Sequence, residues 1–321
     1  MDGFEIANGV LKSYSGKDWI VTVPEGVTAL GDGAFKDNRF VRSVTLSDGV
    51  SEIGNEVFKG CVNLVHIKIP ASVNKIGAAA FNYCEKLRSV IIPDGVSRIE
   101  AMTFCGCSDL AEVVVPKNTV AIEKSAFSLC SSLTEFVIPE KVTEIGDYVF
   151  FGATSLVTVT IHDGVKRIGK SAFGNCFSLE KLTVPRSVTE IGDGAFGAYP
   201  SSGRLDIGYE LVPQLGDWHT SIWAAVRDFL CRFYEGTTTA EENVFWRGYI
   251  GRRTAKVFEY MTDEPMMYRY LTENRIIATK RVPALLDITH NTECRAILLD
   301  YANGGKRKKS NSDPFDTLFD L

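Results

Sequence analysis

A single phenylalanine recurs every 23 residues along the first two-thirds of this chain. The interval is constant, with no insertion or deletion, at Phe35, Phe58, Phe81, Phe104, Phe127, Phe150, Phe173 and Phe196. A second column keeps the same period with leucine or isoleucine, at Leu30, Ile53, Ile76, Ile99, Ile122, Ile145, Ile168 and Ile191. A repeat of this length indicates a solenoid, because one turn can bury its apolar side only against the neighbouring turns.

The repeat consensus is P-x-x-V-x-x-I-G-x-x-A-F-x-x-C-x-x-L-x-x-V-x-I, and its parts predict the local structure. Apolar residues at alternate positions, such as Val90 and Ile92, predict a short strand with one buried face. The proline that follows cannot donate to a strand ladder, so it ends the strand. The glycine of the Ile-Gly step, as in Ile76-Gly77, is expected to adopt a positive φ in a turn.

The chain divides where the period ends. Asn8-Gly9 is a strong hairpin signal between two apolar runs. Beyond Leu211 the period is lost, and Ile222, Trp223 and Val226 recur at helical spacing. The predicted organisation is a repeat solenoid over residues 1–212 with a hairpin cap at 3–20 and about eight repeats at 20–212, a helical domain over 213–305, and a tail over 306–321.

The pattern V-x-x-I-G-x-x-A-F-x-x-C-x-x-L resembles the BspA-type leucine-rich repeats of bacteria and some protists. The opening Asn8-Gly9-Val10-Leu11, with Tyr14 and Gly16, resembles the hairpin at the start of such proteins. The resemblance implies an α/β repeat solenoid, right-handed, with an N-terminal β-hairpin cap, followed here by a small all-α domain as a C-terminal helical extension. It also implies a protein-binding or adhesive role, commonly at the surface of bacterial cells.

Composition excludes several classes of function. The formal net charge is −5, whereas a general nucleic-acid binder should be basic. Membrane insertion is not expected, because no stretch of about 18 apolar residues exists. The opening residues 1–5 have neither a basic nor an apolar leader region, so a cytoplasmic location is expected. A cell-surface location is the alternative if a leader has been removed.

Residues that could carry chemistry are explained by the repeat. Five cysteines share one column with Ala153, which favours small buried side chains over a metal or redox ladder: Cys61, Cys84, Cys107, Cys130 and Cys176. The G-x-G-x-x-G match at residues 192–197 follows the repeat consensus and lacks a βαβ context. His66 and His162 lie four turns apart, so they cannot meet in a catalytic triad. No catalytic residue, cofactor or metal is therefore expected.

The candidate site lies on the outward face of the repeat strands, where side chains alternate with the buried ones. Ile91, Val114 and Val137 occupy one outward column in three consecutive turns and are expected to form an exposed apolar strip. The charged and polar candidates beside this strip are Glu112, Glu135, Lys68 and His66. Two alternatives stay open: the β-branched residues only favour the strand, or the helical domain covers them.

The predicted function is a non-enzymatic protein–protein interaction scaffold that binds a protein partner on the exposed face of the repeat sheet. One alternative, which the resemblance implies, is a cell-surface adhesin of a host-associated bacterium. An alternative of another class is an enzyme in the helical domain, which is rich in tryptophan and tyrosine. A pocket with convergent polar groups would favour the enzyme.

Overall fold

The computed structural model of the chain describes residues 3–200, 202–216, 219–253 and 264–304. The chain forms two compact units, Met1–Phe229 and Leu230–Leu321. The first unit extends beyond residue 212, where the 23-residue period ends. The tail predicted at residues 306–321 lies outside the described residues.

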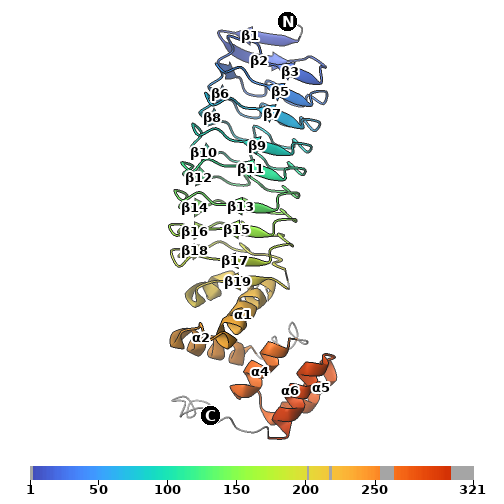
Figure 1. Cartoon of the computed structure of the whole chain (residues 1–321), viewed down its shortest axis with the longest axis vertical. Coiled ribbons are helices and arrows are strands. Elements are labelled where there is room, and N and C mark those ends of the chain that lie inside the picture. Colours follow the sequence, from blue (N-terminus) through green and yellow to red (C-terminus); the bar gives the residue numbers. More distant parts are fainter. Residues whose placement is uncertain (1–2, 201, 217–218, 254–263, 305–321) are drawn as a thin grey trace. The chain divides into compact units, whose positions relative to one another are not determined.

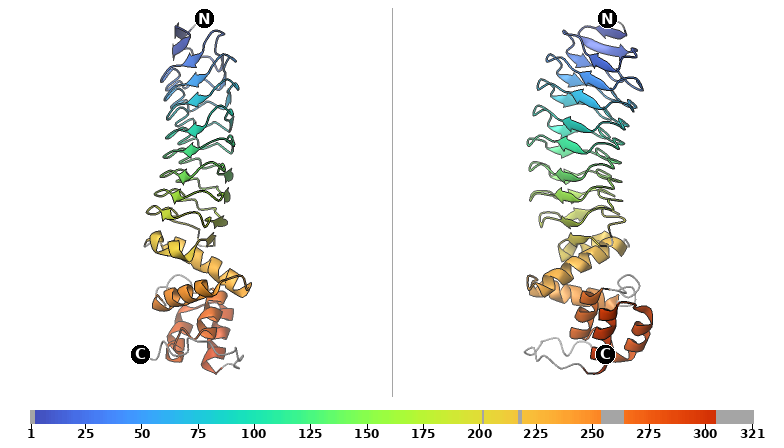
Figure 2. Two further views of the ribbon diagram at one scale, coloured as in Figure 1. Left: turned by 90° about the vertical axis from the view of Figure 1, so that its left-hand side faces the viewer. Right: turned by 45° about the vertical axis from the view of Figure 1, so that its right-hand side comes forward.

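The first unit is a solenoid of about nine turns, as the repeat predicts (Figures 1 and 2). It opens with an antiparallel hairpin of β1 (Phe4–Ala7) and β2 (Val10–Tyr14), which confirms the predicted cap. Each following turn adds one strand to each of two parallel columns. We call these the three-residue column and the two-residue column, after the length of their strands.

The three-residue column comprises β3 (Ile20–Thr22), β5 (Ser43–Thr45), β7 (His66–Lys68), β9 (Ser89–Ile91), β11 (Glu112–Val114), β13 (Glu135–Val137), β15 (Thr158–Thr160), β17 (Lys181–Thr183) and β19 (Arg204–Asp206). The two-residue column comprises β4 (Ala29–Leu30), β6 (Glu52–Ile53), β8 (Lys75–Ile76), β10 (Arg98–Ile99), β12 (Ala121–Ile122), β14 (Glu144–Ile145), β16 (Arg167–Ile168) and β18 (Glu190–Ile191). Neither ladder is continuous. Strand pairing is interrupted between β7 and β9, between β11 and β13, and between β8 and β10.

The repeating phenylalanines form the centre of the core. All eight rings are at most 1% exposed. Successive ring centroids are 5.0–5.9 Å apart with interplanar angles of 3–24°, so the rings stack along the solenoid. Tyr14 of the hairpin continues the stack, with its centroid 5.0 Å from that of Phe35. This geometry is within the range that aromatic pairs prefer.

The cysteine column has a structural use that the sequence did not reveal. The thiol of each column cysteine donates to the carbonyl oxygen of the phenylalanine 26 residues earlier, as in Cys61 Sγ to Phe35 O at 3.0 Å and Cys130 Sγ to Phe104 O at 3.2 Å. Tyr199 occupies the same column in a later turn, and its hydroxyl donates to Arg204 O at 3.0 Å. All eight cysteines are free.

These buried thiols are expected to resist alkylation in the folded protein at pH 8. Burial raises the pKa of the Cys61 and Cys176 thiols to about 12, so almost none of the reactive thiolate is present. Cys231 and then Cys105, which are half-buried, should react first. Iodoacetamide labelling with peptide mass spectrometry measures this, and unfolding should release eight reactive groups. Equal labelling rates for Cys61 and Cys231 would contradict the buried hydrogen-bonded role.

The prediction of a positive φ at the Ile-Gly step is wrong. Gly77, Gly146 and Gly169 are not among the residues with positive φ. They are glycines because a Cβ at Gly77 would lie 2.6 Å from Asn55 N, and one at Gly169 would lie 2.6 Å from Asp147 N. The backbone of the preceding turn therefore leaves no room for a side chain.

Left-handed backbone falls elsewhere in the repeat, mostly on residues other than glycine. Two positions per turn, four residues apart, adopt it: Met102 (φ 59°) and Gly106 (φ 77°) in one turn, Ser125 (56°) and Leu129 (60°) in the next. In the second of these columns, Tyr83 lies over Gly106, where an added Cβ would be 2.6 Å from its ring. Glycine thus alternates with a large side chain that covers it.

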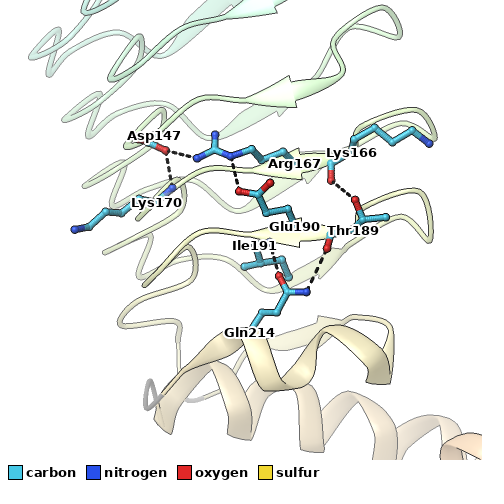
Figure 3. A network of polar contacts seen from close by, with 8 residues as sticks. All are labelled: Asp147, Lys166, Arg167, Lys170, Thr189, Glu190, Ile191 and Gln214. Atoms are coloured by element: carbon cyan, nitrogen blue, oxygen red, sulfur yellow. Dashed lines mark hydrogen bonds and ion pairs between the residues drawn. The ribbon is translucent and has the colours of Figure 1, made fainter.

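The two-residue column ends at a side chain whose amide group makes the hydrogen bonds that another strand would make. Gln214 lies 23 residues after Ile191 and belongs to η1 (Tyr209–Leu215). Its Oε1 accepts from Ile191 N at 2.8 Å, and its Nε2 donates to Thr189 O at 3.2 Å (Figure 3). An amide side chain offers one donor and one acceptor, as a peptide group does. The edge of β18 is therefore satisfied without another strand.

The second unit is helical, as predicted from the spacing. After α1 (His219–Tyr234), whose last residues belong to this unit, the described helices are α2 (Ala240–Arg252), α4 (Pro265–Glu273), η2 (Thr279–Arg281), α5 (Val282–Ile288) and α6 (Thr292–Ala302). Thr239 closes a capping box at the start of α2, and Asn291 caps α6. Within the described residues, no helix combines the length and apolar character needed to span a membrane.

Candidate functional site

The outward positions of the three-residue column are exposed on all its strands except β5 and β19, where they are half-buried. On β9, Val90 is 3% exposed and faces the core, whereas Ser89 and Ile91 face solvent. The same order holds on β13, β15 and β17. The strands of this column lie side by side along the first unit (Figure 2), so their outward residues form two neighbouring columns.

The apolar strip of Ile91, Val114 and Val137 is exposed in all three turns. The exposed fractions of these residues are 70%, 45% and 58%. Ile91 and Val114 are direct partners in the parallel pairing of β9 with β11. Val137 belongs to the next turn, but β13 pairs with β15 and not with β11. Ile91 and Val114 thus lie on strands that are hydrogen-bonded to each other, whereas Val137 lies on a strand that is not hydrogen-bonded to theirs.

The other candidates lie at the same face. Glu112 and Glu135 flank the strip from the second outward column of β11 and β13, and both are exposed. His66 and Lys68 are exposed on β7, which belongs to the sheet β3-β5-β7 and precedes the turn of Ile91. The structure therefore places all seven candidates on one face, distributed over three separate hydrogen-bonded ladders.

Charges on the two-residue column are paired from turn to turn. Lys75 Nζ lies 2.6 Å from Glu52 Oε1, and this contact raises the pKa of Lys75. Arg98 pairs with Glu123 in the same manner. Each of these charges is offset by an opposite charge from another turn.

Arg167 extends this pairing over three turns. It bridges Glu190 at 2.9 Å and Asp147 at 3.1 Å (Figure 3). Burial alone would raise the pKa of Asp147, but the backbone N–H of Lys170 and the Arg167 guanidinium outweigh it and lower that pKa. Most charges of the two-residue column are therefore paired within the solenoid, with Glu144 on β14 as the exception among the described strands.

Charges beside the apolar strip are not paired. Within residues 3–200 that the structure describes, none of the candidates Lys68, Glu112 and Glu135 takes part in an ion pair, and neither does His66. Glu112 and Glu135 occupy the same column in successive turns, so each has a carboxylate of the same charge, and not a counterion, in the neighbouring turn. On β19 the situation differs, because Arg204 binds Asp228 at 3.0 Å. The middle of the face thus carries charge that has no counterion among the described residues.

A shallow hollow lies on the two-residue column. Its volume is about 370 Å³, and it opens where Ala121 interrupts a row of longer side chains, between Arg98 and Glu144. Its lining includes carboxylates but no histidine or cysteine, and two of these carboxylates, Glu123 and Asp147, form ion pairs with Arg98 and Arg167. Among the described residues, no three His, Cys, Asp or Glu side chains are grouped as metal ligands.

The sequence missed a second exposed apolar group at the start of the same face. Trp19, Ile20 and Phe40 are 61%, 76% and 45% exposed. The predicted hairpin cap at residues 3–20 includes Trp19 and Ile20, but Ile20 lies 23 residues before Ser43 and is its direct partner in the pairing of β3 with β5. Extending the outward columns by one period would have found it.

Known proteins share the architecture of the first unit. A family model for the BspA type leucine rich repeat region matches residues 12–134 and 120–211. A solved leucine-rich repeat protein from Bacteroides ovatus is 25% identical with a TM-score of 0.54, covering 58% of this chain and 50% of that protein. The chain therefore spans only half of that relative. No curated protein matches the chain.

Two further solved structures are similar at lower TM-scores. The leucine-rich repeat protein of T. pallidum is 27% identical with a TM-score of 0.46, covering 64% of this chain and 87% of that one. A protein from Faecalibacterium prausnitzii, described as a leucine rich cell surface protein, is 26% identical with a TM-score of 0.44, covering 62% of this chain and 72% of that one.

Proposed function

The chain belongs to the BspA-type leucine-rich repeat family, and from that premise we propose that it is a non-enzymatic scaffold that binds a protein partner through its three-residue column. The contrast between the two strand columns supports this choice of face. Most charges on the two-residue column are paired between turns, whereas Glu112, Glu135 and Lys68 form no ion pair with the residues that the structure describes. Unpaired surface charge costs little in water and is available to steer and orient a partner.

The apolar strip is the proposed centre of the contact. Three exposed β-branched side chains occupy one column in successive turns, and grouped apolar residues mark interaction sites more often than scattered residues do. Glu112 and Glu135 form an acidic border on one side of it. The partner that fits this border presents an apolar segment flanked by lysine or arginine.

Replacing both Val114 and Val137 with lysine is expected to weaken partner binding at least tenfold, which corresponds to about 1.4 kcal/mol. Lysine places a charge at the centre of the apolar contact, while both positions face solvent and should not affect folding. The full chain would be used to capture partners from its native host, and the dissociation constant of each captured protein would then be measured by calorimetry.

The matched control is Val120→Lys, since Val120 is 43% exposed but precedes the two-residue strand β12. This variant should bind the partner as the wild type does. If Val120→Lys weakens binding as much as the double variant does, the added positive charge explains the loss and the apolar strip is not the contact site. Unchanged binding in the double variant, or capture of no protein at all, would show that the proposed face is wrong.

A further inference from the structure

The start of the solenoid carries a cluster of exposed aromatic and basic side chains, which we call the N-terminal corner: Lys17, Trp19, Ile20, Phe40 and Arg42. Trp19 and Ile20 are 61% and 76% exposed. Phe40 lies in the equivalent loop of the next turn and is 45% exposed. The cluster therefore exposes large apolar side chains on two successive turns.

Each ring in the N-terminal corner has a cation over it. The guanidinium carbon of Arg42 lies 4.3 Å from the Trp19 ring centroid, and Lys17 Nζ lies 5.6 Å from that of Phe40. Neither cation forms an ion pair with any residue that the structure describes, and the nearby exposed Arg39 forms none either. The nearest acid in sequence, Asp18, accepts a 2.7 Å hydrogen bond from the Tyr14 hydroxyl. The corner thus presents positive charge together with aromatic surface.

Backbone contacts hold these side chains in place. Asn38 Oδ1 accepts from Phe40 N at 3.0 Å and from Val41 N at 3.1 Å, and Asn38 Nδ2 donates to Gly16 O at 3.0 Å. Trp19 O accepts from the backbone N–H of Arg42 at 2.8 Å. A ligand would therefore not have to order these loops, and preorganisation of this kind increases affinity.

Tryptophan and arginine in a fixed, exposed cluster have the composition of a binding hot spot. The ligand that complements them is acidic and carries large apolar side chains. The chain itself contains such a segment at residues 313–321, D-P-F-D-T-L-F-D-L, with three aspartates among two phenylalanines and two leucines. We propose that the N-terminal corner binds residues 313–321 of a second copy of this chain.

A second copy is the expected source for a geometric reason. The corner is in the first turn of the solenoid, and turns spaced about 4.8 Å apart put the last one on the order of 40 Å away. The acidic segment follows both the last turn and the helical unit in the sequence, and a second copy can present it to the corner whatever the arrangement of the two units. Binding between copies joins the start of one chain to the end of the next, which gives a head-to-tail assembly.

The proposal is tested with a fluorescent peptide of residues 310–321, titrated with the full chain and followed by anisotropy. Trp19→Ala and Arg42→Glu should each weaken peptide binding at least tenfold, because one removes the aromatic platform and the other reverses the charge. Lys141→Glu is the matched control, since Lys141 is exposed, lies on a later turn and forms no described ion pair. This control should change the affinity less than twofold.

Sedimentation equilibrium of the full chain gives the second readout. Self-association should increase with concentration in the wild type and disappear in Trp19→Ala. A lack of peptide binding, or equal binding by the corner variants, would overturn the proposal. Equal binding of a scrambled peptide would also overturn it, since the corner would then recognise composition and not this segment. Val114→Lys should leave peptide binding intact, so this test is independent of the apolar strip.

Discussion

Replacement of Phe127 by alanine is expected to lower the free energy of unfolding by about 3–5 kcal/mol. Its ring is fully buried and stacks between Phe104 and Phe150, with centroids 5.5 and 5.9 Å away. The neighbouring rings are held by their own turns, so they cannot close the cavity. Phe104→Ala should cost a similar amount for the same reason. Urea unfolding followed by circular dichroism measures both losses.

Phe177→Ala is the control for these two variants. Phe177 is 55% exposed, so its loss should change the free energy of unfolding by no more than about 0.5 kcal/mol. A loss below about 1 kcal/mol in Phe104→Ala and Phe127→Ala would mean that stacked turns can repack around a missing ring. The core would then depend on the leucine and isoleucine columns.

Features set by neighbours along the chain were predictable from the sequence. The inward position of Val90 and the outward positions of Ser89 and Ile91 follow from side-chain alternation alone. The cap of α6 at Asn291 follows from its side-chain chemistry in the same way. The predicted location and the tail at residues 306–321 stay predictions.

Features set by the spacing between turns were not predictable from a consensus. The interruption of the ladder between β11 and β13 depends on how closely two turns approach, and the consensus is the same on both sides of it. The pairing of Lys75 with Glu52 could have been found, because these residues are 23 positions apart and opposite in charge. A comparison of the charges of residues one period apart would have distinguished the two-residue column, where opposite charges follow one another, from the three-residue column.

The glycine of the Ile-Gly step gives the second large expected effect. Gly169→Ala should lower the free energy of unfolding by about 2–3 kcal/mol. The new Cβ would lie 2.6 Å from Asp147 N and from Gly146 C, which are backbone atoms of the preceding turn. Gly169 N also donates to Ile145 O at 2.8 Å, so relief of the clash would break a bond of the ladder.

One of the two exceptions in this column supports that expectation. Glutamate replaces the glycine at Glu100, and β10, which precedes it, does not pair with β8. At Glu123 the replacement is accommodated, since β10 and β12 still pair and Glu123 N donates to Ile99 O at 2.9 Å. We expect Gly169→Ala to follow the first case and disrupt the pairing between β14 and β16, which runs through Ile145 and Ile168.

Urea unfolding and amide hydrogen exchange distinguish this outcome from a general loss of stability. Exchange at residue 169 should become at least tenfold faster in Gly169→Ala, while the amide of Phe58, bonded to Ala80 O at 2.7 Å several turns away, should keep its protection. Gly49→Ala is the control, because a Cβ there meets only Val27 O, at 3.6 Å, and its column holds Ser72 and Asn118 in other turns. If both variants are as stable as the wild type, close approach of the turns is not what selects glycine, since a methyl group would then fit between them.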